Sequence, residues 1–468
     1  MIELRHRQLS FADQFVLDES RPLREPWMAR IDQVLEDDEL LGVVFEALAN
    51  RRPQSRRRGR LSTPAEVVIR MLLLKHIRNW SYQVLEREVR PNLVYRDFTR
   101  VGSGKVPDAK TMGRLALVLG PEVIQQIHRR VIEIARREGV VEGRKMRVDT
   151  TVVETNIHYP TDSTLLGDGV RVLTRVMKEL GELTTRTGAR LRDRSRSVKL
   201  RILEIGRASR SRGEQAQRKR EVAYEKLLES TQRVVGQAKR FVAEIAGGVK
   251  RALRGCKSEV AGCREQLEEM IPRVEQVIRQ TRQRIFGGDT HAEGKLFSLF
   301  EPHTEIIRKG KASKPNEFGK MVKIQEAENQ MVIDYQVYEQ RPADSDLLVA
   351  AVETHQEKLG RAPHLAAADA AFYSARNEEE VRQRGVKRVS IPNRSTKSPE
   401  RKREQKKRWF KRGQKWRTGC EGRISVLKRR HGLRRSLYRG LDGIKRWVGL
   451  GVIADNLIQI GTVLASRE

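Results

Sequence analysis

Alternating apolar and polar residues mark two short segments of the chain, MVKIQ at 321–325 and MVIDYQVYE at 331–339. A period of two is typical of half-buried strands, and the intervening EAENQ predicts an antiparallel hairpin. The run RKMRVDTT, which contains Asp149, has the same character and is expected to pair with this hairpin. Apolar runs at 364–368 and 386–391 predict two further strands.

The N-terminal part of the chain carries helical patterning instead. Thr63 as N-cap, followed by a proline and by Glu66 at the third helical position, predicts the start of an apolar helix over 65–77. Further helices are expected from Ser81 and after a cap near Asp108. Three short helices in this order are compatible with a helix-turn-helix fold, and equally with a plain helical domain.

If the N-terminal helices read DNA, the contacts are expected at the start of the third helix. Lys110, Thr111 and Arg114 lie there. Their side chains would then reach the DNA from the first turns of that helix.

Long, charged helices with few aromatic residues are predicted from about 170 to 284. Apolar residues recur there at steps of three and four, which defines a seam of 3.5-residue period. The seam consists of Leu227, Thr231, Val234, Ala238, Phe241 and Ile245. It fits an antiparallel helical hairpin as well as an intermolecular coiled coil, with 170–183 and 264–278 as candidate partner helices. The Arg-rich stretch 185–220 is either a solvated face or a surface for DNA backbone.

The predicted order is strand, insertion, two strands, helix, strand, helix, strand and helix. This is the order of an α/β RNase H-like fold, a mixed sheet with flanking helices, interrupted after its first strand by an all-α insertion. We expect an N-terminal helical domain at 1–140, with helix-turn-helix-like DNA binding as its expected role. The first part of the RNase H-like domain is then expected at 141–169, the helical insertion at 170–289, and the rest of the RNase H-like domain at 290–468.

The composition is strongly basic, since 94 Lys and Arg stand against 61 Asp and Glu, for a formal net charge of +33. This excess favours a polyanionic partner, above all nucleic acid. The basic segment RSTKSPERKREQKKR (394–408) is expected to be a mobile loop that orders on DNA.

A membrane is the rival partner, but no strongly apolar basic amphipathic helix supports it. The apolar stretch 447–465 is interrupted by polar residues and is interpreted as a buried amphipathic helix. The three Cys have no CxxC spacing, so neither a zinc site nor a disulfide framework is indicated. We expect a reducing, cytoplasmic location.

Three acidic residues indicate the chemistry. Asp149 and Asp369 end predicted strands, and Glu421 lies on a predicted helix. A carboxylate at a strand end is held on rigid backbone yet faces solvent, and a third one from a helix can close a cluster around Mg²⁺. Any one of them alone would be read as a surface residue. Their joint placement in a basic chain indicates phosphoryl chemistry on nucleic acid.

Arg417, Glu421 and Lys428 fall on one face of the predicted helix, in the pattern Arg-x3-Glu-x6-Lys. With Asp149 and Asp369, this pattern resembles the DDE transposases of bacterial insertion sequences. The block RWFKRGQKWRTGCEGRISVLKRRHGL is most similar to the ISNCY-type members. The resemblance covers most of the chain.

The resemblance implies that Asp149, Asp369 and Glu421 are catalytic and hold two Mg²⁺ or Mn²⁺ ions, with Asp149 bridging both. Arg417 and Lys428 look like phosphate clamps, and a solvated charge is the alternative for each. The implied activity is binding of terminal inverted repeats, cleavage of the element ends and transfer of 3′-hydroxyls to target DNA. The expected setting is a bacterial, nucleoid-associated homo-oligomer.

Related families carry a Tyr three residues before the Arg, where this chain has Gln414, so a DNA-hairpin step stays open. Trp409 and Trp416 are predicted to stack on an exposed base, with core packing as the alternative. His158, just after the first strand, is a candidate near the metals or simply a hydrogen-bonded loop residue. The rival functions are a related nuclease without strand transfer and a non-catalytic basic scaffold for nucleic acid.

Overall fold

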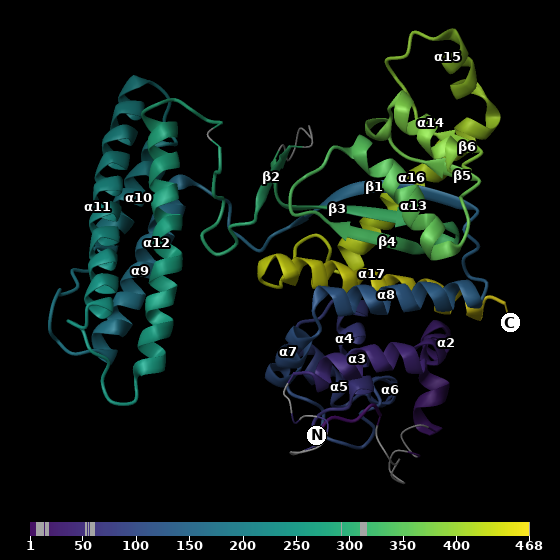
Figure 1. The fold of residues 1–468 in the computed structure, drawn as a ribbon, viewed down its shortest axis with the longest axis horizontal. Coiled ribbons are helices and arrows are strands. Elements are labelled where there is room, and N and C mark those ends of the chain that lie inside the picture. Colours follow the sequence, from purple (N-terminus) through teal and green to yellow (C-terminus); the bar gives the residue numbers. More distant parts are fainter. Residues whose placement is uncertain are drawn as a thin grey trace. The chain divides into compact units, whose positions relative to one another are not determined.

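The computed structural model describes residues 1–5, 14, 18–51, 54, 56, 61–291, 293–308 and 316–467. They form two compact units. The main unit combines Met1–Asn156 with Ile307–Glu468, and the insertion unit is Ile157–Ile306. In Figure 1 the insertion unit is the bundle of teal helices, and the main unit contains the sheet with the purple and yellow helices. Along the chain, the two segments of the main unit stand before and after the insertion unit.

The described part of the insertion unit is helical, with α9 (Asp162–Leu183), α10 (Ser195–Ala208), α11 (Glu214–Ala246) and α12 (Lys257–Ile285). These helices pack on one another around one apolar core. Leu227, Val234 and Phe241 of the predicted seam are buried in that core. The seam therefore joins helices of a single chain.

The insertion unit is longer than the predicted 170–289 at both ends. At its start, α9 begins at Asp162, where the Thr161 side chain accepts a hydrogen bond from the Thr164 backbone N–H. At its end, Leu296 and Leu299 follow α12 and pack back onto the bundle. The apolar period of α9 in fact begins before 170, since Leu166 is followed by Val170 and Leu173, whereas the segment after α12 that holds Leu296 and Leu299 is not helical.

The main unit contains a mixed sheet whose strands are β1 (Lys145–Glu154), β2 (Glu305–Arg308), β3 (Asn316–Glu326), β4 (Val332–Val337), β5 (Leu365–Ala367) and β6 (Arg388–Ser390). The strand order is β2-β3-β1-β5-β6, and β4 also pairs with β3. β1 is antiparallel to β3, and β3 to β4, as the predicted hairpin required. β1, β5 and β6 run parallel. Each predicted strand is present.

Helices cover both faces of this sheet (Figure 1). On one face, η3 (Asp344–Leu347), α13 (Leu348–Leu359) and α14 (Ala375–Gln383) pack on an apolar layer that includes Val148 and Val152 of β1. On the other face, α16 (Arg408–Arg430) and α17 (Gly440–Ala465) enclose a layer that includes Val153. Because side chains alternate along a strand, Arg147, Asp149 and Thr151 belong to the α16 face.

The basic segment 394–408, expected to be a mobile loop, contains a helix, α15 (Pro399–Lys406). The Ser398 side chain caps it by accepting a hydrogen bond from the Arg401 backbone N–H. Arg401 is buried, and its guanidinium bonds to Glu378, Glu404 and the Ile391 carbonyl. The loop prediction was wrong because the charge of the segment obscured this cap and this anchor.

The N-terminal part of the main unit consists of η1 (Arg21–Leu23), α2 (Pro26–Leu35), α3 (Asp38–Ala49), α4 (Ala65–Ile77), α5 (Tyr82–Val89), α6 (Leu93–Phe98), α7 (Ala109–Val118) and α8 (Pro121–Arg137). The predicted caps Ser81 and Asp108 are confirmed. Thr63 does not cap α4: Pro64 occupies the N-cap position, and Glu66 instead pairs with Arg70.

α17 is long and apolar enough to cross a membrane by composition, yet it is largely buried within the main unit. It packs against α2, α4, α8 and β4. Its polar residues are used internally: Asp455 accepts from the Arg423 guanidinium at 2.7 Å, and Asn456 accepts from the Val332 N–H at 2.9 Å. The stretch is thus a buried helix as predicted, although it is covered on nearly all sides and not on one face.

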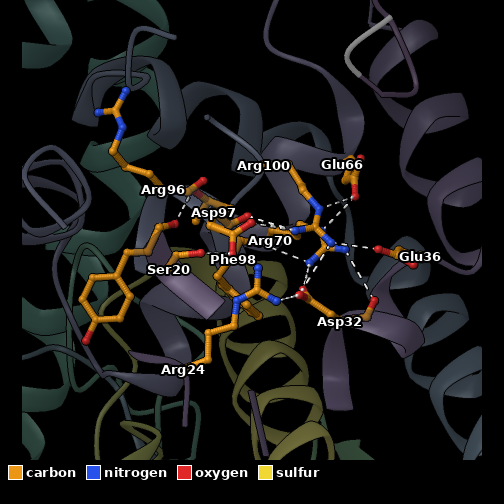
Figure 2. Close-up of polar contacts among 12 residues, drawn as sticks. Ser20, Arg24, Asp32, Glu36, Glu66, Arg70, Arg96, Asp97, Phe98 and Arg100 are labelled. Atoms are coloured by element: carbon orange, nitrogen blue, oxygen red, sulfur yellow. Dashed lines mark hydrogen bonds and ion pairs between the residues drawn. The ribbon is translucent and has the colours of Figure 1, made fainter. Parts of the chain in front are cut away.

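A buried cluster of ion pairs joins the N-terminal helices (Figure 2). At its centre the fully buried Arg70 of α4 donates to Asp32 of α2 at 2.6 Å and to the Phe98 carbonyl of α6 at 3.1 Å. Arg24 and Arg100 complete the cluster by pairing with the surrounding carboxylates. A buried cation needs such partners, because an unpaired charge costs several kcal/mol of folding free energy.

Candidate active site on the sheet

Asp149 lies within β1, which continues to Glu154 and so does not end at this acid as predicted, and Asp369 lies two residues past the end of the adjacent parallel strand β5. The register pairs Met146 with Ala366 and Arg147 with Ala367, and each Asp is two residues beyond the last of these pairs. Parallel neighbours are about 4.8 Å apart, so the two carboxylates extend from the same level of the sheet. Each also has the same local anchor, because one carboxylate oxygen accepts the N–H of the next residue, at 2.8 Å for Asp149 and 2.6 Å for Asp369.

α16 crosses the same face of the sheet and brings Glu421 to it. Its path depends on two glycines: a Cβ added to Gly413 would meet Ser390 Cβ of β6 at 2.7 Å, and one added to Gly419 would meet the Arg147 guanidinium. Arg147 also donates to the Trp416 carbonyl at 2.6 Å and to Glu326 at 2.5 Å. These contacts fix the helix against β1, and the sequence analysis did not identify them.

Arg417 links the helix to the strand. Its guanidinium lies 2.8 Å from the Glu421 carboxylate and 3.8 Å from that of Asp149. Asp149 and Arg417 are largely buried, with 17% and 14% of their side chains exposed, whereas 57% of Glu421 is exposed. Asp149 and Glu421 are therefore brought together through one shared cation.

Burial raises the pKa of Asp149 to about 6. The negative charges of Asp369 and Glu421 raise it further, while the Thr150 N–H and the Arg417 guanidinium oppose the rise. Since like charges affect one another in this way only at short range, the three acids share one electrostatic site. Excess negative charge of this kind is suited to binding a cation.

The donors fit a hard divalent cation by type, because carboxylate oxygens are its preferred ligands. Asp149 and Asp369 each retain one oxygen beyond the one bound to backbone N–H. Among the described residues, no three His, Cys, Asp or Glu side chains stand close enough together to ligate one ion. Arg417 lies between Asp149 and Glu421 where a cation would be needed, so Glu421 has to turn for all three to share one.

Asp344 is the first residue of η3, and its side chain does not cap a helix. It accepts a hydrogen bond from the Thr150 hydroxyl at 2.9 Å. Thr150 follows Asp149 directly, so Asp344 supports the strand next to the acid. Nothing in the spacing of the sequence marked this contact.

Gln414, at the position of the Tyr in related families, turns toward the sheet. Its side-chain amide donates to the carbonyls of Ala368 and Ser390, at the ends of β5 and β6. Gln414 therefore anchors α16 to the strands.

The two candidate stacking residues each have a guanidinium over the ring. Arg388 lies 5.7 Å from the centroid of Trp409, and Arg147 lies 4.9 Å from that of Trp416.

The remaining predicted residues are more dispersed. Lys428 lies on α16, two turns beyond Glu421, and is half-buried. Lys110 and Arg114 are exposed on α7, which packs against α3, α4 and α5. His158 belongs to the insertion unit, where its Nε2 lies 3.6 Å from the Asp168 carboxylate.

Two segments of the chain match known protein families. Residues 15–116 match a family described as a transposase domain (DUF772), and residues 375–461 match a family described as a transposase DDE domain. Together these two matches support a DDE transposase of an insertion sequence. The second segment contains Arg417, Glu421 and Lys428, while Asp149 and Asp369 lie outside both segments.

The matched segments support the prediction of an insertion-sequence transposase that acts on DNA. The finer assignment to the ISNCY type stays a prediction. A DDE domain implies an RNase H-like fold, and the mixed sheet of the main unit is consistent with it. No curated protein and no solved structure matches the chain.

Proposed function

We propose that this transposase binds the terminal inverted repeats of its element, cleaves the element ends and joins their 3′-hydroxyls to target DNA. The observation that carries the proposal is the shared register of Asp149 and Asp369, with Arg417 connecting Asp149 to Glu421. The matching DDE domain family supports the same chemistry. A site of this kind needs carboxylates held in fixed positions next to a surface that accepts DNA.

In this proposal Asp149, Asp369 and Glu421 hold two Mg²⁺ or Mn²⁺ ions. When bound, such ions supply activation of the attacking water or 3′-hydroxyl and stabilisation of the leaving oxygen. The chain supplies the positions of the three carboxylates. Asp149 and Asp369 are fixed by the backbone N–H groups that they accept, and the exposed Glu421 reaches the site by changing its rotamer.

Arg417 is assigned to the DNA in this proposal. Its guanidinium lies beside the carboxylates of Asp149 and Glu421. With those carboxylates assigned to the ions, its fork of N–H donors would be available for a DNA phosphate, to which it is suited. Lys428, on the same helix, provides a second phosphate contact.

Further DNA contacts are assigned to Trp409 and Trp416 by base stacking and to Lys110 and Arg114 on α7 by backbone contact. The N-terminal helices would then hold the inverted repeat. Two element ends must be brought together for joining, so we propose a homo-oligomer as the active form.

The test is incubation of purified protein with a labelled duplex ending in the inverted repeat and a supercoiled target, with Mg²⁺ or Mn²⁺. Glu421→Gln should reduce cleavage and joining by more than about 100-fold, because loss of a ligand exceeds the roughly 10- to 100-fold cost of losing a supporting residue. The matched control is Glu379→Gln, the same change at an exposed acid of α14, which should leave both products unchanged.

The other outcomes have distinct meanings. Cleavage without joined product would identify a nuclease on the same fold. Metal-independent binding without either product, equal in wild type and Glu421→Gln, would identify a non-catalytic scaffold and would refute the proposal.

A further inference from the structure

A basic hollow of about 600 Å³ lies at the opposite ends of the strands that carry the acids. Its walls include Lys145, Leu365 and Arg388, which are the first residues of β1, β5 and β6. Asp149 and Asp369 are each four residues further along their strands, or roughly 13 Å at 3.3 Å per residue. We call this hollow, closed on one side by the start of α16, the amino-end groove.

The cations that line the amino-end groove are Lys145, Arg388, Lys407, Arg408 and Arg412. All five are exposed, and no acidic residue is among the lining residues. Within the described part of the chain, none of the five forms an ion pair. Nearby arginines behave differently, since Arg382 and Arg401 both pair with Glu378. Repulsion among unpaired cations in a concave surface is relieved by a bound polyanion.

Two tryptophans share the same groove. Trp409 and Trp416 line it together with the cations, and both are half-buried. Arg388 lies over the ring of Trp409 and Arg147 over that of Trp416, so cation–π contacts help to hold both rings. Fixed aromatic rings between phosphate-binding cations are the arrangement by which proteins bind single-stranded nucleic acid.

We propose that the amino-end groove binds an unpaired stretch of DNA strand, with its phosphates on the five cations and its bases against Trp409 and Trp416. The inference deepens the proposed function by specifying which form of DNA this surface takes, and it rests on DNA being the substrate. It does not depend on metal chemistry. Strand separation next to a cleaved end would supply such a stretch.

The test uses the full chain in EDTA with a labelled oligothymidylate and measures fluorescence anisotropy over a range of salt. The double variant Arg408→Ala/Arg412→Ala should bind at least about tenfold more weakly and lower the salt slope by about 1.4, at about 0.7 per phosphate contact on a single strand. Trp409→Ala should weaken binding roughly 5- to 150-fold, the equivalent of one lost stacking contact, and Trp409→Phe should restore most of it.

Two controls separate an effect of the groove on binding from a general effect of charge and from an effect of the substitutions on folding. Arg137→Ala removes one charge from an exposed position at the end of α8 and should bind like wild type. Thermal unfolding should give the same transition for the double Arg variant and wild type, since its side chains are exposed.

Unchanged oligothymidylate binding in the double Arg variant would overturn the proposal. An equal loss for duplex and single strand would also overturn it, in favour of a duplex-binding surface. If wild type shows neither cleavage nor joining while the groove variants still lose single-strand binding, the proposed function fails and this inference stands.

Discussion

Asp149 is a mostly buried carboxylate near two other acids, an arrangement that costs the folded protein stability. Its raised pKa means that the folded state binds its proton more tightly than the unfolded state does. At neutral pH the ionised group therefore lowers the stability of the metal-free protein. In the proposed function, a cation bound at Asp149 would offset this loss of stability.

Asp149→Asn is expected to stabilise the metal-free protein. The folded pKa is about 6 against a usual 3.8, so the destabilisation is fully present above pH 6 and disappears below pH 3.8. The gain should approach about 3 kcal/mol at pH 8 and vanish near pH 3.5, at 1.36 kcal/mol per pKa unit. Urea unfolding in EDTA at the two pH values measures it.

Added Mg²⁺ should separate wild type from Asp149→Asn. It should raise the Tm of wild type in proportion to binding and leave that of the variant unchanged, because only the folded wild type gains a ligand. A variant that loses stability equally at both pH values in EDTA would show that Asp149 is an ordinary structural residue.

α16 is the element on which the site depends, because it carries Arg417 and Glu421 across the sheet. Gly413 and Gly419 allow it to lie close to β6 and β1. Gly422, on the same helix, has no atom within 4 Å of an added Cβ. The helix thus provides its own comparison between a glycine that is required by packing and one that is not.

Gly413→Ala is expected to destabilise the main unit by about 1 to 3 kcal/mol, the usual cost of overpacking, and to shift α16. Gly422→Ala should instead stabilise it by up to about 1 kcal/mol, because alanine is the better helix former. Thermal unfolding measures both. Equal effects of the two substitutions would mean that α16 does not depend on close approach at Gly413.

Much of the sheet could be predicted from local pattern, since alternation identified β1, β3 and β4 and apolar runs identified β5 and β6. The short β2 has no such pattern. The role of Gly413 depends on Ser390 of another element, which no local window contains. The same is true of Asp344, whose partner Thr150 lies 194 residues away. The candidate acids could be selected from residue type and spacing, whereas the contacts that hold them could not.

At the scale of the whole molecule, the two units have separate cores. The apolar cluster of the insertion unit contains only residues between Leu165 and Leu299, and the other clusters contain none of these. A unit with its own core can fold without the rest of the chain. The insertion unit is therefore expected to fold independently of the sheet.

A fragment of residues 157–306 is expected to fold alone into a helical bundle. Circular dichroism should show high helix content and a cooperative thermal transition. The shorter fragment 170–289 is the matched control: it lacks the first turns of α9 and the packing of Leu296 and Leu299, so its transition should be lower and broader. A non-cooperative 157–306 would show that the bundle needs the main unit.

Because the insertion unit lies between the two segments of the main unit along the chain, it also sets the order in which paired strands are synthesised. β1 leaves the ribosome well before its partner β3, because the insertion unit is made between them. At about 5 to 20 residues per second, the 150 residues of that unit take about 8 to 30 s. During this interval the strand that bears Asp149 has neither neighbour, and the N-terminal helices wait longer still for α17. The nascent chain thus contains its N-terminal helices and its bundle before the three candidate acids can come together.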